Sequence, residues 1–221
     1  MLIFDNSDYQ VHALALGPLR TNCFIVENST YSFLIDPVGE GDLISSYLAD
    51  NNISIDFCMA THGHFDHVGA AAHLIEQGFC QKLYIHEDDA VELRRCNTYS
   101  LLLDKKPIKL PSEDQITWFD ADFSTHLKTV GFKIEHLASH TAGSTIFYTQ
   151  DRQLLFSGDI LLRQPKARNN RCKIGESKVK IEQALLHISE TFHPETIVFP
   201  GHGKMMRLDS EHAMQDEIQD S

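Results

Sequence analysis

The sequence predicts an α+β fold in which two β-sheets pack face to face, with helices on their outer sides. Two observations support this prediction. Each half of the 221-residue chain gives several strand-like segments, then a helix-like segment and then one more strand. Stacking two sheets in this way would bury the apolar faces of both halves. The halves share this order of elements without a clear repeat in the sequence itself.

The first half alternates strands and helices, as hydrophobic periodicity and turn residues indicate. Its expected strands lie at residues 9–16, 22–27, 31–35, 56–60 and 82–85. Its expected helices lie at residues 42–49, 68–76 and 87–95. Asp36-Pro37 ends the third strand, because the residue before a proline resists the helical region.

The second half follows a less regular segment at residues 97–112 and is richer in strands. Its expected strands lie at residues 115–119, 126–130, 133–137, 144–149, 153–157 and 196–199. Gln150-Asp151-Arg152 predicts a hairpin between two of these strands, and a helix is expected at residues 178–192. Because no linker rich in Gly, Pro or Ser interrupts the chain, we expect a single domain over residues 1–207 and an acidic tail at residues 208–221.

Composition excludes several classes of protein. A formal charge of −12 argues against binding of nucleic acid, which normally requires a basic balance. No apolar run approaches the roughly 18 residues that span a membrane, and no secretory signal precedes the first strand. The five cysteines are odd in number and lack a Cys-x-x-Cys pair, which favours reduced thiols in a cytoplasm.

The central motif is Thr61-His62-Gly63-His64-Phe65-Asp66-His67, directly after the strand expected at residues 56–60. In an extended segment, the side chains of His62 and His64 leave on the same side. Asp66 and His67 would open the next helix, where aspartate is favoured as a cap and by the helix dipole. Histidines with a carboxylate suit zinc, and also iron or manganese.

Four ligands on one turn do not close easily around a single tetrahedral ion, so two ions are expected. Further candidate ligands stand where later strands end, each in a turn that contains glycine: His140, Asp159 and His202. In open α/β sheets the strand ends are where binding sites usually form.

On these residues the chain resembles the metallo-β-lactamase superfamily, and within it the glyoxalase II-like branch. The resemblance runs from about Gly17 to Gly203 and includes Gly17-Pro18-Leu19-Arg20-Thr21-Asn22-Cys23 and Ile35-Asp36-Pro37. It implies a four-layer αββα sandwich with a site for two divalent metal ions, zinc being favoured and iron or manganese open. By position, one ion would be held by His62, His64 and His140. The other would be held by Asp66, His67 and His202, with Asp159 bridging the two.

The resemblance implies a metal-dependent hydrolase that cleaves a thioester or ester of the S-lactoylglutathione type. A hydroxide held between two ions is a competent nucleophile, and the ions polarise the carbonyl group. We expect His62, His64, Asp66 and His140 to act in catalysis as well as in metal binding. The net positive charge of such a centre would attract a small anionic acyl substrate.

Two other functions stay open. A persulfide (sulfur) dioxygenase would use one iron, held by the residues aligned with His62, His140 and Asp159. A lactonase or other small-molecule esterase would use the same two-metal chemistry on another substrate. The zinc β-lactamases with a cysteine ligand are disfavoured, because Asp159 stands where they have cysteine.

A basic segment at residues 163–173 follows the Asp159 turn. Four of its cations are candidate substrate-binding residues, namely Arg163, Lys166, Arg168 and Arg171. They would hold carboxylate or phosphate groups by charge-assisted hydrogen bonds. The alternative is a solvated loop, or one that pairs with the acidic tail.

Asp36 is expected either to end its strand or to support the histidines from behind. The other histidines lack ligand spacing and are expected to be packing or surface residues: His12, His73, His86, His126, His136, His187, His193 and His212.

Overall fold

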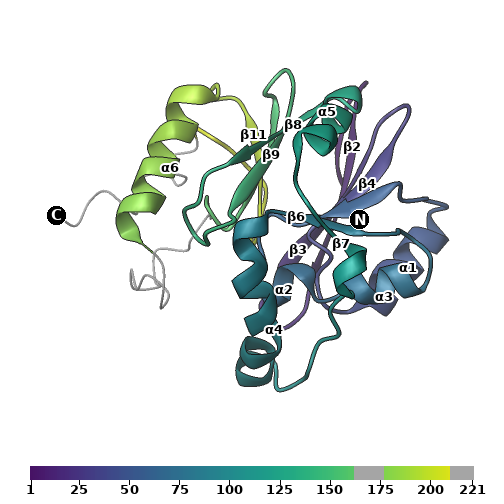
Figure 1. The fold of residues 1–221 in the computed structure, drawn as a ribbon. Coiled ribbons are helices and arrows are strands. Elements are labelled where there is room, and N and C mark those ends of the chain that lie inside the picture. The colour runs from purple at the N-terminus through teal and green to yellow at the C-terminus, as the bar shows by residue number, and fades with distance from the viewer. Residues whose placement is uncertain (162–176, 210–221) are drawn as a thin grey trace.

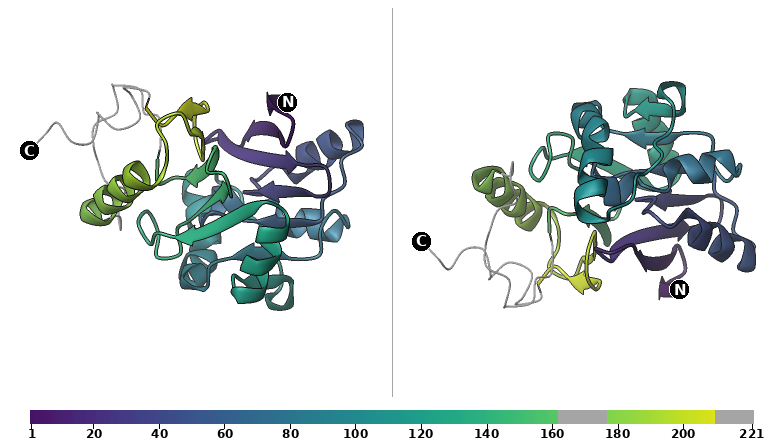
Figure 2. Two further views of the ribbon diagram at one scale, coloured as in Figure 1. Left: turned by 90° about the horizontal axis from the view of Figure 1, so that it is seen from above. Right: turned by 90° about the horizontal axis from the view of Figure 1, so that it is seen from below.

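The computed structural model describes residues 1–161 and 177–209, which form four layers in the order helix, sheet, sheet, helix. Figure 1 shows α6 (Lys178–Thr191) on one outer side, and α1 (Gly41–Asp50) and α3 (Ala71–Glu76) on the other. The two views in Figure 2 show the same layers from above and below. The expected α+β sandwich is confirmed.

The larger sheet has seven strands in chain order, β1 to β7. Its strands are β1 (Leu2–Asp5), β2 (Gln10–Leu16), β3 (Thr21–Glu27), β4 (Ser32–Ile35), β5 (Phe57–Met59), β6 (Leu83–Ile85) and β7 (Ile116–Trp118). The first four strands pair antiparallel, and β4 to β7 pair parallel. The parallel strands all end at one edge, which is where β5 delivers the histidine motif.

The smaller sheet has five strands in the order β12-β11-β10-β9-β8. They are β8 (Phe132–His136), β9 (Thr145–Thr149), β10 (Leu154–Gly158), β11 (Ile197–Pro200) and β12 (Met206–Arg207). Because β9 is antiparallel to both β8 and β10, and β11 is parallel to β10, the strands β8, β10 and β11 end at the same edge. These three strands precede the other candidate ligands.

Alternation along the strands builds the layers. In β3, Phe24 and Val26 face the core between the sheets, whereas Cys23 and Ile25 face the outer helices. Phenylalanines dominate the inner core, including Phe33, Phe57, Phe132, Phe147, Phe156 and Phe199. The alternation of inward-facing and outward-facing residues along β3 has a period of two, and both sets are apolar because the strand is buried on both faces.

Helices cover both outer faces. Ile44 and Leu48 of α1 pack on the larger sheet, together with residues of α2 (Phe65–Val68), α3 and α4 (Ala90–Leu103). Ala184 and Ile188 of α6 pack on the smaller sheet. Among the described residues, no helix combines the length and the apolar character that a membrane crossing requires.

Several local expectations were wrong. Residues 126–130 were expected to form a strand but mostly belong to α5 (Ala121–Thr129). Asp120 caps this helix by accepting a hydrogen bond from the Phe123 backbone at 2.7 Å, and Phe123 and Leu127, four residues apart, face the inner core. Of the helix expected at residues 68–76, residues 71–76 form α3, and Val68 is the last residue of the separate helix α2. Helix α4 continues to Leu103, into the segment expected to be irregular.

The two sheets are joined by backbone contacts at the edge that carries the candidate ligands. The amide of Thr145 donates to the carbonyl of Thr61 at 2.9 Å, and the amide of Asn22 donates to the carbonyl of Gly201 at 2.7 Å. These contacts place the turns after β5 and β11 beside the facing sheet.

Candidate metal centre

The predicted ligands meet at the shared edge of the two sheets. His62 and His64 follow β5, and Asp66 and His67 lie in α2. From the smaller sheet, His140 follows β8, Asp159 follows β10 and His202 follows β11. The structure therefore brings together all seven residues that the sequence singled out, from both halves of the chain.

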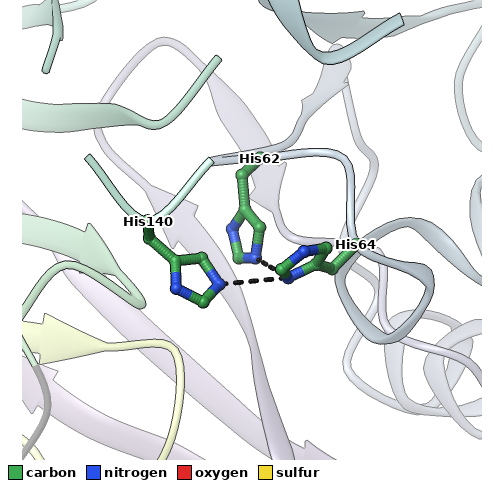
Figure 3. A group of neighbouring side chains, drawn as sticks. All are labelled: His62, His64 and His140. Atoms are coloured by element: carbon green, nitrogen blue, oxygen red, sulfur yellow. Dashed lines mark hydrogen bonds between the residues drawn. The ribbon is translucent and has the colours of Figure 1, made fainter. Parts of the chain in front are cut away.

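Three histidines converge to form the first group (Figure 3). Nδ1 of His64 lies 3.0 Å from Nε2 of His62 and 3.0 Å from Nε2 of His140. His62 and His140 are buried, and His64 is partly exposed. Three imidazole nitrogens directed at one point are a donor set suited to a zinc or iron ion.

The second group consists of Asp66, His67 and His202. Oδ2 of Asp66 lies 3.7 Å from Nε2 of His67 and 3.5 Å from Nε2 of His202. Asp159 lies between the groups, because its Oδ2 is 3.6 Å from Nε2 of His140 and 3.4 Å from Nε2 of His202. One carboxylate thus reaches both groups, which is the geometry that a bridging ligand requires.

Asp36 lies behind both groups and orients one histidine in each. Its Oδ2 accepts a hydrogen bond from Nδ1 of His67 at 2.9 Å. The same oxygen accepts the hydroxyl of Thr61 at 3.0 Å, and the hydroxyl oxygen of Thr61 lies 3.0 Å from Nδ1 of His62. With both Nδ1 atoms engaged, the Nε2 atoms of His62 and His67 face the centre. Of the two expectations for Asp36, support of the histidines is the one that the contacts favour.

Electrostatics differs between the two groups. Burial, followed by the neighbouring imidazoles, lowers the pKa of His62 well below its ordinary value, and burial with His140 lowers the pKa of His64 to about 3. Burial would also lower the pKa of His67, but surrounding carboxylates, led by Asp36, raise it well above its ordinary value. Burial would raise the pKa of Asp159, but His67 and other imidazoles hold it well below its ordinary range.

His67 gives a test of whether these residues fit a metal ion. Its side chain is fully buried, and among the described residues Nε2 makes no hydrogen bond. This nitrogen faces Oδ1 of Asp159 at 3.4 Å and Oδ2 of Asp66. A buried polar atom without a hydrogen bond is costly, and a metal ligand at this position would remove that cost. The donor set and the buried nitrogen therefore both fit a bound ion.

Close backbone approach at Gly201 keeps this centre compact. A Cβ atom added there would lie 2.8 Å from Cε1 of His67 and closer still to Oδ1 of Asp159. Only glycine leaves the two side chains where they are.

Two further contacts hold ligands in position. The hydroxyl of Thr21 donates to Oδ2 of Asp66 at 2.8 Å, and Nδ1 of His202 lies 3.2 Å from the carbonyl oxygen of Leu19. Oε2 of Glu92 lies 3.8 Å from Nε2 of His64, which is too far for a hydrogen bond. Thr21 and Leu19 belong to the segment around residues 17–23 that carried part of the family resemblance.

Asp89 was missed by the sequence analysis. It is completely buried, and its Oδ2 accepts the amide of Gly63 at 2.7 Å and the hydroxyl of Thr141 at 2.8 Å. Its Oδ1 accepts the amide of Gly143 at 2.6 Å. A single carboxylate thereby ties the loop of His62 and His64 to the loop of His140. In the sequence, Asp89 is marked only as one of several acidic residues where a helix begins after β6.

The predicted substrate-binding residues lie outside the described residues, at positions 163, 166, 168 and 171, and so does His212. Among the described histidines outside the centre, His12 is buried and lies 2.7 Å from the hydroxyl of Tyr47. His187 lies 2.6 Å from Oε1 of Glu135, which is consistent with the expected surface role.

Comparison with known proteins agrees with the fold. The profile of the family described as the metallo-beta-lactamase superfamily matches residues 16–202. The chain is 25% identical over 194 residues to the probable metallo-hydrolase YqgX of Bacillus subtilis, covering 86% of this chain and 88% of that protein. It is 26% identical over 211 residues to the hydroxyacylglutathione hydrolase GloC of Haemophilus influenzae, covering 91% and 94%.

A solved structure is also similar. TTHA1623, crystallised in a di-iron-bound form, superposes with a TM-score of 0.77 at 29% sequence identity, and the match covers 90% of this chain and 96% of that chain.

Proposed function

Because the chain belongs to the metallo-beta-lactamase superfamily, we propose that it is a two-metal hydrolase that cleaves a small thioester or ester. The observation that carries the proposal is the position of Asp159 between two complete ligand groups. Two ions bound there would activate a water molecule and polarise the substrate carbonyl. Zinc is the favoured metal; iron is supported by the di-iron form of TTHA1623, and manganese stays open.

The residues of the chain would divide the work as follows. His62, His64 and His140 would hold one ion, and Asp66, His67 and His202 the other. Asp36 and Thr61 would keep one imidazole of each group in the correct orientation through the contacts described above. Asp89 would hold the ligand loops at their mutual spacing. Positioning of this kind contributes to catalysis because it fixes the reacting groups before the reaction begins.

The proposed substrate is a small anionic acyl compound, with S-lactoylglutathione as the type. The name of the Haemophilus influenzae relative and the family resemblance support this choice. The net positive charge of a centre with two divalent ions would attract an anion, and the cations Arg163, Lys166, Arg168 and Arg171 are proposed to bind it.

A mononuclear iron dioxygenase is the second candidate, since His62, His140 and Asp159 come together here. The two-metal assignment is favoured over it because it gives a role to both ligand groups, whereas one ion on these three residues leaves Asp66, His67 and His202 without a metal. A lactonase or other esterase would keep both ions and differ only in substrate.

Elemental analysis, paired with an assay of S-lactoylglutathione hydrolysis, tests the proposal. Two metal ions per chain with turnover are the expected result. One iron per chain, with oxygen consumption on glutathione persulfide, would select the dioxygenase. Two ions without turnover of the thioester, but with hydrolysis of a lactone or ester, would reassign the substrate.

A further inference from the structure

A second cluster of ligand-type side chains lies where β6 and β8 end. His86 follows β6 and His136 is the last residue of β8, so the pair spans the two sheets. Their rings stack with centroids 3.6 Å apart and planes inclined by 22°. Oδ2 of Asp88 lies 3.7 Å from Nδ1 of His86 and 3.8 Å from Nε2 of His136. One ligand atom from each of the three residues therefore lies within 4.8 Å of the other two.

Solvent and ions can reach this cluster. The side chains of His86, His136 and Asp88 are 20%, 32% and 53% exposed. In residues 1–161 and 177–209, the ion-pair contacts of Asp88 are to these two imidazoles and to no lysine or arginine. Burial and the neighbouring His136 also lower the pKa of His86, which keeps its ring neutral at neutral pH.

We propose that His86, Asp88 and His136 form an auxiliary site for a divalent transition-metal ion such as Zn²⁺, separate from the seven-residue centre. Two imidazoles and one carboxylate are a donor set that zinc accepts, with water completing the coordination. Because the lone pair of an imidazole nitrogen lies in the plane of its ring, one of the two stacked rings must turn toward Asp88 before both nitrogens bind the same ion. The ion then gives Asp88 the cationic partner that its position lacks within the described residues.

Occupancy of this site is conditional, because both rings already bond to the backbone. Nδ1 of His86 accepts the amide of Asp88 at 3.2 Å. Nε2 of His136 donates to the carbonyl of Ala142 at 2.7 Å. An ion that takes these nitrogens replaces both hydrogen bonds, so it binds more weakly than ions in the main centre and only at higher free metal.

The second of these bonds connects the auxiliary site to the main centre. Ala142 lies between His140 and Gly143, in the loop that Asp89 holds by accepting a hydrogen bond from the Gly143 amide. An ion on His136 releases the carbonyl of Ala142 and loosens the loop that carries His140. Zinc beyond the amount that fills the main centre therefore lowers turnover. This coupling rests on the proposed hydrolase function, whereas the site itself does not.

Counting bound zinc tests the site. The metal-loaded wild type is compared with His86→Gln, His136→Gln and Asp88→Asn by equilibrium dialysis at rising free Zn²⁺. The wild type should take up one more zinc ion per chain than each variant. His193→Gln is the matched control, because Nδ1 of His193 accepts the amide of Glu195 at 3.2 Å, the same turn contact that His86 makes. The site would be overturned if the exposed Asp88→Asn variant and the His136→Gln variant each bound as much zinc per chain as the wild type.

The coupling has its own readout. Inhibition by excess zinc should disappear in all three variants and persist in the His193→Gln control. Inhibition that persists in the variants, although they bind one ion fewer, would overturn the coupling and leave the site standing. Since zinc counting needs no substrate, failure of the proposed hydrolase activity and failure of the auxiliary site are distinguishable.

Discussion

Oδ2 of Asp36 accepts a hydrogen bond from Nδ1 of His67 at 2.9 Å, and both side chains are almost completely buried. Through the hydroxyl of Thr61, the same oxygen also orients His62. A single carboxylate therefore controls the direction of one imidazole in each ligand group. Asp36 reaches this position with φ of 57°, a left-handed conformation that aspartate tolerates better than most residues.

Asp36→Asn should weaken metal binding in both groups by roughly 10–100-fold. The amide keeps the size of the side chain but replaces one accepting oxygen with an NH₂ group, so either Thr61 or His67 loses its acceptor. The measurement is metal bound per chain at a series of buffered free-metal concentrations. Asp42→Asn, at a carboxylate that is 97% exposed, is the control. Equal metal affinity in Asp36→Asn and the wild type would contradict the role of Asp36.

Asp89→Asn should destabilise the protein by about 1–3 kcal/mol and reduce turnover. The new NH₂ group would face one of the amides of Gly63 and Gly143, and the space is tight, since a Cβ added at Gly143 would lie 2.6 Å from Cγ of Asp89. Urea unfolding of the metal-free and metal-loaded forms gives the stability. Glu87→Gln, at an exposed acid two residues away, should match the wild type. A fully stable Asp89→Asn variant with unchanged turnover would show that the loops do not depend on this carboxylate.

Metal affinity should depend on pH differently in the two groups. In the metal-free protein the raised pKa of His67 keeps its ring protonated at neutral pH, whereas the lowered pKa values of His62 and His64 leave their rings neutral. An ion that binds to the second group must displace the proton of His67. The affinity of that group for metal therefore increases with pH until the pH exceeds the raised pKa of His67, and it decreases as the pH is lowered. Binding by His62 and His64 displaces no such proton until pH drops well below 6.5.

Metal counts after dialysis at about pH 6, 7 and 8, together with proton release on metal addition, measure this difference. One ion should leave first on acidification, and its binding should release a proton. Parallel loss of both ions with falling pH would contradict the assignment.

The double variant Arg168→Gln/Arg171→Gln should raise KM for an anionic thioester by about tenfold or more and change kcat little. Each guanidinium is proposed to bind an anionic group of the substrate, away from the reacting bond. Lys178→Gln/Lys180→Gln removes the same charge from the start of α6 and serves as the control. Equal KM values in the two double variants would show that the effect is one of net charge, and an unchanged KM would remove the basic segment from substrate binding.

The ligand positions could be predicted because each one combines a ligand-type residue, a strand end and a nearby glycine. His140, Asp159 and His202 carry all three signals, and the expected strands before them were close to β8, β10 and β11. Asp89 carries no such signal. Glu87, Asp88 and Asp89 are adjacent carboxylates in the sequence, and only packing against the loops of Gly63 and Gly143 distinguishes the third.

The errors in the fold have physical reasons as well. Thr129 and Val130 are β-branched, so their propensity favours a strand. The segment is helical instead, because Asp120 caps α5 and the helix buries Phe123 and Leu127. The short edge strands β1 and β12 were not expected, because their own sequences carry no clear strand pattern. Pairing with β2 and β11 stabilises them instead. In each case burial in the core or pairing with a neighbouring strand contributed, and neither is visible in local propensity.

The backbone contacts that join the sheets have a mechanical consequence. Thr61 and Gly201, which flank ligands of different groups, are each hydrogen-bonded to the opposite sheet. Each group combines ligands from both sheets, so the distances within each group are set by how the sheets dock as well as by side-chain rotamers. Core substitutions that shift one sheet against the other would widen both groups from a distance, with every ligand still in place.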